Sequence, residues 1–93
     1  MVLLTLPNGL DHCRFGFAAS KALGGAVKRN RAKRLMREAV RAQLLQVASG
    51  WDMVWIARAP LLGAGFDRVR SDAAAQLRRA GLLRDELDER SQP

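Results

Sequence analysis

The sequence has one cysteine, one histidine and no tyrosine among its 93 residues. A lone Cys13 cannot form an internal disulfide and is typical of proteins in a reducing compartment. A lone His12 leaves no pair of imidazoles for a metal site, and no set of serine, histidine and acid suggests that the protein performs hydrolysis itself. We therefore expect no catalytic residue, no metal ligand and no cofactor bound by the protein.

The sequence also lacks a long hydrophobic run. No apolar stretch approaches the roughly 18–20 residues that cross a membrane, and residues 1–6 lack the basic flank and the length of a signal peptide. We expect a cytoplasmic protein that does not contact a membrane. The length suits one small domain, and an apolar content of 48% is ordinary for a globular chain.

Positive charge is concentrated in one segment. Residues 21–41 hold eight basic residues and one acid, Glu38, whereas the rest of the chain holds eight of each sign. This segment therefore accounts for the whole net charge of +7. A clustered excess creates a local potential that attracts a polyanion, which could be nucleic acid, an anionic membrane or an acidic protein.

The order of predicted elements is strand, strand, helix, strand, helix. Hydrophobic periodicity, Pro7 and the glycines place these elements at residues 2–6, 13–20, 26–49, 51–58 and 66–80. We expect the first two strands to pair antiparallel, a loop over residues 59–65, and Gly81 to terminate the last helix. The fold class is α+β, with one domain over residues 1–83 and a charged, disordered tail over residues 84–93.

The helix predicted over residues 26–49 has two different faces. At 100° per residue one sector is mostly apolar and contains Ala32, Leu35, Met36, Ala39, Gln43 and Val47. The opposite side gathers Asn30, Lys33, Arg34, Arg37 and Arg41. A solvated helix usually mixes both signs at four-residue spacing, whereas here like charges repel. The excess of arginine favours phosphate contacts and hence nucleic acid over a membrane.

The stretch "RFGFAASKALGGAVKRNRAKRLMREAVR", residues 14–41, resembles the bacterial ribonuclease P protein component. The similarity includes a Gly-Phe strand, Ser20-Lys21, the "KRNRAKRL" core and the arginines that follow it. "WDMVWIARAP" is similar to the family's third strand, and the helix ending in "RRAGLL" is similar to its C-terminal helix. The resemblance covers roughly residues 2–83.

The resemblance implies an α/β sandwich with a small mixed sheet, in which the basic helix joins parallel strands by a left-handed crossover. It implies a monomeric subunit that helps a catalytic RNA remove the 5′ leader of precursor tRNA, with magnesium required by that RNA. The RNA-binding residues it implies are Lys21, Lys28, Arg29, Asn30, Arg31, Lys33, Arg34, Arg37 and Arg41.

The resemblance also implies a cleft for the leader, near Phe15, Phe17 and Arg58. Two phenylalanines at period two are more often core residues than surfaces for base stacking, and we assign Trp51 and Trp55 to packing. Family members generally begin with a basic stretch and a helix that forms one wall of this cleft, whereas this chain starts inside the first strand. Either the start codon is misassigned or the cleft is incomplete. The charge alone leaves two alternatives: a ribosomal or ribosome-assembly protein without an enzymatic partner, and a helix that binds an acidic protein.

Overall fold

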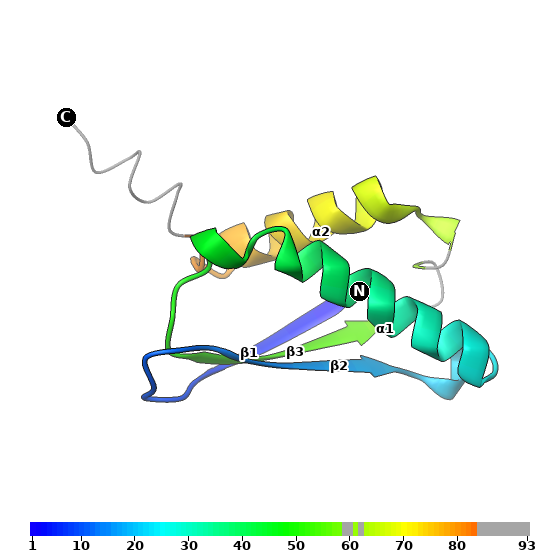
Figure 1. Cartoon of the computed structure of the whole chain (residues 1–93), viewed down its shortest axis with the longest axis horizontal. Helices are drawn as coiled ribbons and strands as arrows, with labels where there is room; N and C mark the ends of the chain where they lie inside the picture. The colour runs from blue at the N-terminus through cyan, green and yellow to red at the C-terminus, as the bar shows by residue number, and fades with distance from the viewer. Residues whose placement is uncertain (59–60, 62, 84–93) are drawn as a thin grey trace.

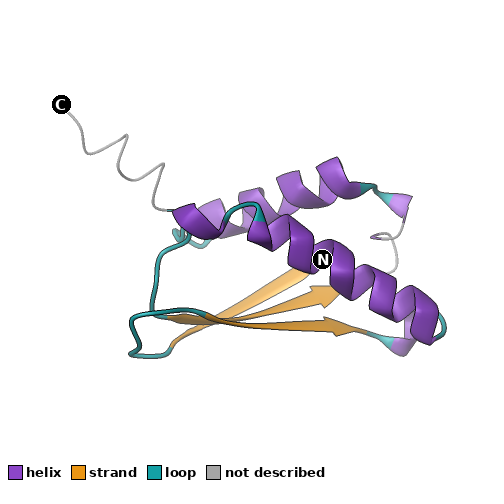
Figure 2. Ribbon diagram, viewed as in Figure 1, coloured by secondary structure: helices purple, strands orange, loops and turns teal. Residues whose placement is uncertain are grey.

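The computed structural model describes residues 1–58, 61 and 63–83. Within them the chain forms β1 (Val2–Pro7), β2 (Arg14–Ala19), α1 (Ala26–Arg41), β3 (Trp51–Ala57) and α2 (Phe66–Arg79). The strands form one sheet, and both helices lie on the same side of it (Figures 1 and 2). The expected α+β class is confirmed. The predicted tail over residues 84–93, and Ala59, Pro60 and Leu62 of the predicted loop, lie outside the described residues.

The order of strands differs from the prediction. The order is β1-β3-β2, with β3 antiparallel to β1 and parallel to β2. The first two strands therefore do not pair, because β3 lies between them. The backbone N–H of Asn8 donates to the carbonyl of Gly50 at 2.9 Å, which holds the start of β3 beside the end of β1. The helix α1 connects the parallel strands, as expected, and the hand of this crossover stays a prediction.

Helix α1 ends at Arg41, eight residues before the predicted boundary. No proline or glycine stops it, and the sequence beyond it still favours a helix. A short 3-10 turn follows at Leu44–Gln46, and the N–H of Ala48 then donates to the carbonyl of Leu82 at 2.8 Å. Val47 also forms a bridge with Leu83. These contacts with the segment after α2 outweigh the local helix propensity.

The second helix agrees with the prediction to within one residue. Its buried side chains are Val69, Ala73 and Leu77, which recur every four residues. The helix is followed by Gly81, whose φ of +75° is accessible to glycine at little cost. The next N–H, of Leu82, donates to the carbonyl of Leu77 at 2.9 Å and satisfies one of the last carbonyls of the helix.

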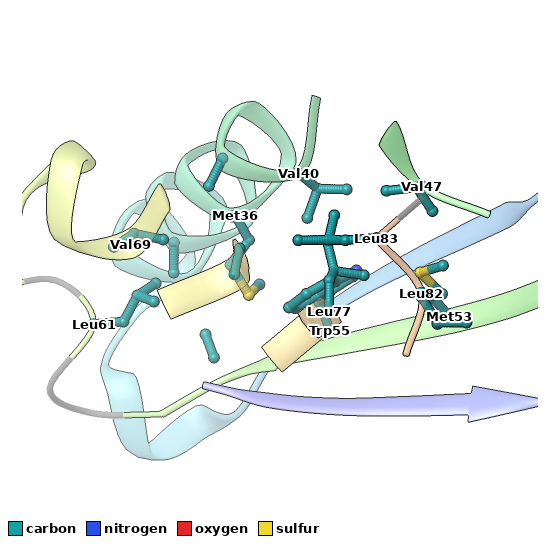
Figure 3. Close-up of a cluster of buried hydrophobic side chains, with 14 of the residues drawn as sticks. Met36, Val40, Val47, Met53, Trp55, Leu61, Val69, Leu77, Leu82 and Leu83 are labelled. Atoms are coloured by element: carbon teal, nitrogen blue, oxygen red, sulfur yellow. The ribbon is translucent and has the colours of Figure 1, made fainter. Parts of the chain in front are cut away.

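The core lies between the sheet and the two helices. Figure 3 shows Met36 and Val40 of α1, Leu77 of α2 and Trp55 of β3 meeting in this layer. Trp55 has no exposed surface, in agreement with its assignment to packing. Two fully buried alanines of α1, Ala32 and Ala39, let the helix approach closely. The core therefore fixes which side of α1 faces inward.

A polar cluster fixes the connection between β1 and β2 to the start of β3. The Arg14 guanidinium donates two hydrogen bonds of 2.7 Å to the carboxylate of Asp52, and the Asn8 amide donates a third at 3.0 Å. The Arg14 guanidinium and then the Asn8 amide lower the pKa of Asp52 from 3.8 to about 2. The cluster thus stabilises the ionised carboxyl.

We expect Asp52→Asn to destabilise the protein at neutral pH and to have less effect in acid. A carboxyl whose pKa is lowered by folding adds stability above its unfolded pKa of about 3.8. This contribution is lost as the pH falls from 3.8 through about 2, because the Asp52 carboxyl then becomes protonated in the folded protein as well. Urea unfolding of both proteins at pH 6 and pH 2.5 measures the difference. An equal difference at both pH values would contradict the role of the ionised carboxyl.

Candidate nucleic-acid interface

The orientation of α1 presents its charged residues outward. Ala32, Met36, Ala39 and Val40 face the core, and Leu35 is half-buried. Most of the predicted RNA-binding residues are exposed, namely Lys21, Lys28, Asn30, Arg31, Arg34, Arg37 and Arg41. The other two, Arg29 and Lys33, are half-buried. Over residues 26–41 the structure therefore buries and exposes the two faces that the sequence predicted. The exception is Val40, which was not predicted to lie in the core.

The basic residues of α1 form two groups. Four of them, Arg29, Lys33, Arg37 and Arg41, follow one another at four-residue spacing, which separates neighbours by about 6 Å along the helix axis. We call this row the basic ridge. It lies toward β2, because the Arg37 guanidinium carbon is 5.5 Å from the centre of the Phe17 ring. Asn30 and Arg34 lie beside the ridge on the solvent side, by their angular positions.

Lys28 and Arg31 lie away from the ridge. At 100° per residue they are displaced from Arg37 by about 180° and 120° around the helix. The stem of Lys28 instead lies close to Gly24, where the methyl group of an alanine would approach Lys28 Cδ to 2.7 Å. The structure therefore brings together only part of the set that the sequence predicted.

The charges of α1 are not neutralised by the residues that the structure describes. In the part of the chain that the structure describes, the ion pairs are Arg14–Asp52 and His12–Asp11, and neither involves α1. Glu38 is exposed on the same helix but lies within 4.0 Å of no described basic group. Arg29 is anchored by packing, since its Nε atom is buried without a hydrogen-bond partner. The guanidinium groups of Arg34, Arg37 and Arg41 thus remain available to an external anion.

Two further basic residues lie at the end of the sheet where α1 begins. Lys21 follows β2 in a short turn whose first residue, Ser20, accepts a hydrogen bond from the N–H of Ala22 at 3.2 Å. Arg58 follows β3 and is exposed. Because β2 and β3 are parallel and Ala19 is paired with Ala57, both basic residues lie at the same end of the sheet. They extend the positive surface beyond α1.

Phe15 and Phe17 lie on the face of the sheet that the helices cover. Phe15 is paired with Met53 and Phe17 with Trp55, so their side chains share the side of those buried residues. Both rings are half-buried and pack against the core. Their place favours a packing role, and a contact with a leader stays a prediction.

The opposite face of the sheet exposes apolar side chains that the sequence analysis did not single out. Leu4, Leu6 and Val54 are 55%, 65% and 40% exposed, and Leu4 is paired with Val54. Both helices lie on the other side of the sheet (Figure 1). The signal in the sequence was the alternation of Val2, Leu4 and Leu6, but the neighbouring Leu3 is apolar too and hides which face is open.

The described residues contain no candidate metal site. None of them forms a group of three or more histidine, cysteine or acidic side chains able to hold a metal ion. A hollow of about 370 Å³ near the start of α2 is lined by Met1, Leu61, Arg68 and Asp72 among others. It contains no nucleophile with an adjacent base. The basic face is therefore the chemically distinctive surface.

None of the described helices is both long enough and apolar enough to span a membrane.

Comparison with known proteins identifies a family. The sequence profile described as Ribonuclease P matches residues 1–81. The "Ribonuclease P protein component" of Roseiflexus castenholzii is 43% identical over 90 residues, which cover 96% of this chain and 74% of that protein. Its counterpart from Roseiflexus sp. is 44% identical over 84 residues, covering 89% and 69%.

Solved structures show the same fold. The RNase P protein of Staphylococcus aureus has a TM-score of 0.75 and 30% identity, covering 87% of this chain and 74% of that one. The RNase P protein of Thermotoga maritima has a TM-score of 0.75 and 31% identity, covering 83% and 74%.

Proposed function

This chain belongs to the ribonuclease P protein family, and on that premise we propose that its basic ridge holds the RNA subunit while that RNA performs the cleavage. The function is that of the protein subunit of ribonuclease P, which assists removal of the 5′ leader from precursor tRNA. Membership in this family disfavours the alternative of a ribosomal protein without an enzymatic partner.

The observation that carries the proposal is the absence of ion pairs on the exposed side of α1, within the described part of the chain. Arg34, Arg37 and Arg41 are exposed, and no described carboxylate neutralises them. Each guanidinium placed on a phosphate releases condensed counterions and adds affinity. The neighbouring Asn30 adds a directional amide among these charges.

The proposal also assigns separate roles to the protein and the RNA. The protein contributes binding and orientation, and the magnesium ions are bound by the RNA. Lys21 and Arg58, at the end of the sheet, extend the positive surface toward the precursor tRNA, and this supports a leader contact there more than at Phe15 or Phe17. One protein molecule acts with one RNA, in the cytoplasm.

Reconstitution with the ribonuclease P RNA of Roseiflexus castenholzii tests the proposal. We expect the protein to increase cleavage of a precursor tRNA most strongly at low magnesium, because bound cationic side chains then replace part of the screening by metal ions. The measurement is the initial cleavage rate over a magnesium series, with and without protein. Equal rates in a sample where gel shift shows the protein bound to the RNA would reject the assisting role.

A further inference from the structure

The contact between Arg37 and Phe17 joins the basic ridge to the sheet. The guanidinium carbon lies 5.5 Å from the ring centre, within the distance of about 6 Å at which a cation is attracted to a ring face. Arg37 comes from α1 and Phe17 from the edge strand β2. The contact therefore fixes an exposed cation relative to a half-buried platform.

The residues around Arg37 do not hold its side chain in place, so the Phe17 ring is the group that can do so. Lys33 and Arg41, four residues before and after Arg37, carry the same charge and repel it. Within the described residues no carboxylate forms an ion pair with Arg37. A free arginine here would move among many rotamers, and RNA binding would have to overcome the entropy of fixing it.

Arg14 and Arg37 are held in different ways. Arg14 donates two hydrogen bonds to Asp52, which occupy its fork and neutralise its charge. A ring face attracts the charge of Arg37 without neutralising it, and no described carboxylate occupies its donors, which can therefore bind a phosphate. The first arrangement suits a structural role, and the second suits binding of an anion.

The platform itself is held firmly. Phe17 is paired with Trp55 in the sheet and packs against the core. Phe15 is its natural comparison, since it lies two residues earlier on the same face and is also half-buried. Arg37 lies over Phe17, and among the described residues no cation lies over Phe15.

We propose that Phe17 is a positioning residue for RNA binding, whose ring holds the Arg37 guanidinium ready for a backbone phosphate of the RNA subunit. This proposal rests on the function proposed above and deepens it by naming how one contact of the basic ridge is preorganised. Preorganisation of this kind improves affinity by reducing the ordering that binding requires.

The test uses Phe17→Leu, which keeps an apolar side chain but removes the ring, and Phe17→Tyr, which keeps the ring. Phe15→Leu is the matched control, and Arg37→Ala provides the second arm of a double-mutant cycle. Each protein is titrated with the ribonuclease P RNA of Roseiflexus castenholzii over a series of salt concentrations. Thermal unfolding of each variant shows which temperatures keep all of them folded.

We expect Phe17→Leu to raise the Kd about two- to fivefold, with Phe17→Tyr and Phe15→Leu close to the starting protein. In the Arg37→Ala background, Phe17→Leu should have no further effect, because the cation that it positions is gone. The slope of log K against log salt for the single variant Phe17→Leu should shift toward the slope for Arg37→Ala.

Two results would show that Phe17 does not act through Arg37. One is an equal effect of Phe17→Leu with and without Arg37, and the other is an equal loss of affinity in Phe15→Leu, which would indicate a general effect on the fold. If Arg37→Ala weakens binding and Phe17→Leu does not, the positioning role alone is wrong. If Arg37→Ala binds normally, the basic ridge is not the RNA-binding face and both proposals fall.

Discussion

Replacing Arg34, Arg37 and Arg41 together by alanine is expected to weaken binding to the ribonuclease P RNA by more than about 3 kcal/mol, which is over a hundredfold in Kd. Each of these side chains is exposed on α1, and none forms an ion pair with a described carboxylate. A hydrogen bond to a charged group, such as a guanidinium–phosphate contact, contributes about 1.5–3 kcal/mol. The three losses need not add in full, because neighbouring charges share phosphates.

The salt dependence gives a second, independent readout of the same substitution. Each lost phosphate contact lowers the slope of log K against log salt by about 0.7 to 0.9. The triple variant should therefore have a slope smaller by about two to three. Titrations at several potassium concentrations measure the slope, and thermal unfolding checks that the exposed substitutions leave the fold intact.

A matched control separates the position of these three arginines on α1 from total charge. Arg68, Arg70 and Arg79 are exposed on α2, and replacing them by alanine removes the same three charges from another helix. We expect this variant to lose much less affinity and to keep most of its salt slope. Equal losses in both triple variants would show that net charge, rather than the position of α1, determines RNA binding.

The sequence predicted the elements of the fold better than their arrangement. Apolar periodicity located β1, β2, β3 and α2 to within two residues, because burial on one face leaves a regular pattern. The pairing of strands could not be predicted in this way. Alternation with a period of two indicates which side chains share a face of the sheet, but not which strand is the neighbour. A hydrogen bond between Asn8 and Gly50, far apart in the chain, reflects the actual neighbour.

The end of α1 shows how tertiary contacts outweigh propensity. Residues 42–49 contain alanine, leucine and glutamine, which favour a helix, yet the helix ends at Arg41. The chain instead turns so that Ala48 and Val47 pair with residues beyond α2. A partner about 35 residues away leaves no signal in the local pattern.

The candidate site was predictable in composition but not in detail. Counting charges predicted that basic residues are concentrated in this segment. The helical period of 3.6 residues predicted which side of the helix carries them. The division between the basic ridge and Lys28 with Arg31, and the contact of Arg37 with Phe17, required the position of α1 over β2. Such contacts depend on how two elements pack, which one sequence does not specify.

Trp55→Ala is expected to lower the free energy of unfolding by about 3–5 kcal/mol, the usual cost of removing a large buried aromatic side chain. Trp55 has no exposed surface and lies in the central strand, in the same core cluster as Leu77 and Leu83 (Figure 3). A domain of this size has roughly 5–15 kcal/mol in total, so the variant should be close to unfolding at 37 °C. Urea unfolding of both proteins at 25 °C measures the change.

Trp55→Phe is the informative companion of that substitution. The indole Nε1 of Trp55 is buried without a hydrogen-bond partner, and an unpaired buried donor of this kind costs about 1–3 kcal/mol. Phenylalanine removes this donor while keeping a ring, so the relief offsets part of the lost packing. We expect its loss to be less than half that of Trp55→Ala. A loss of more than half would mean that the indole N–H has a partner in solution, because both substitutions would then remove a hydrogen bond as well as volume from the core.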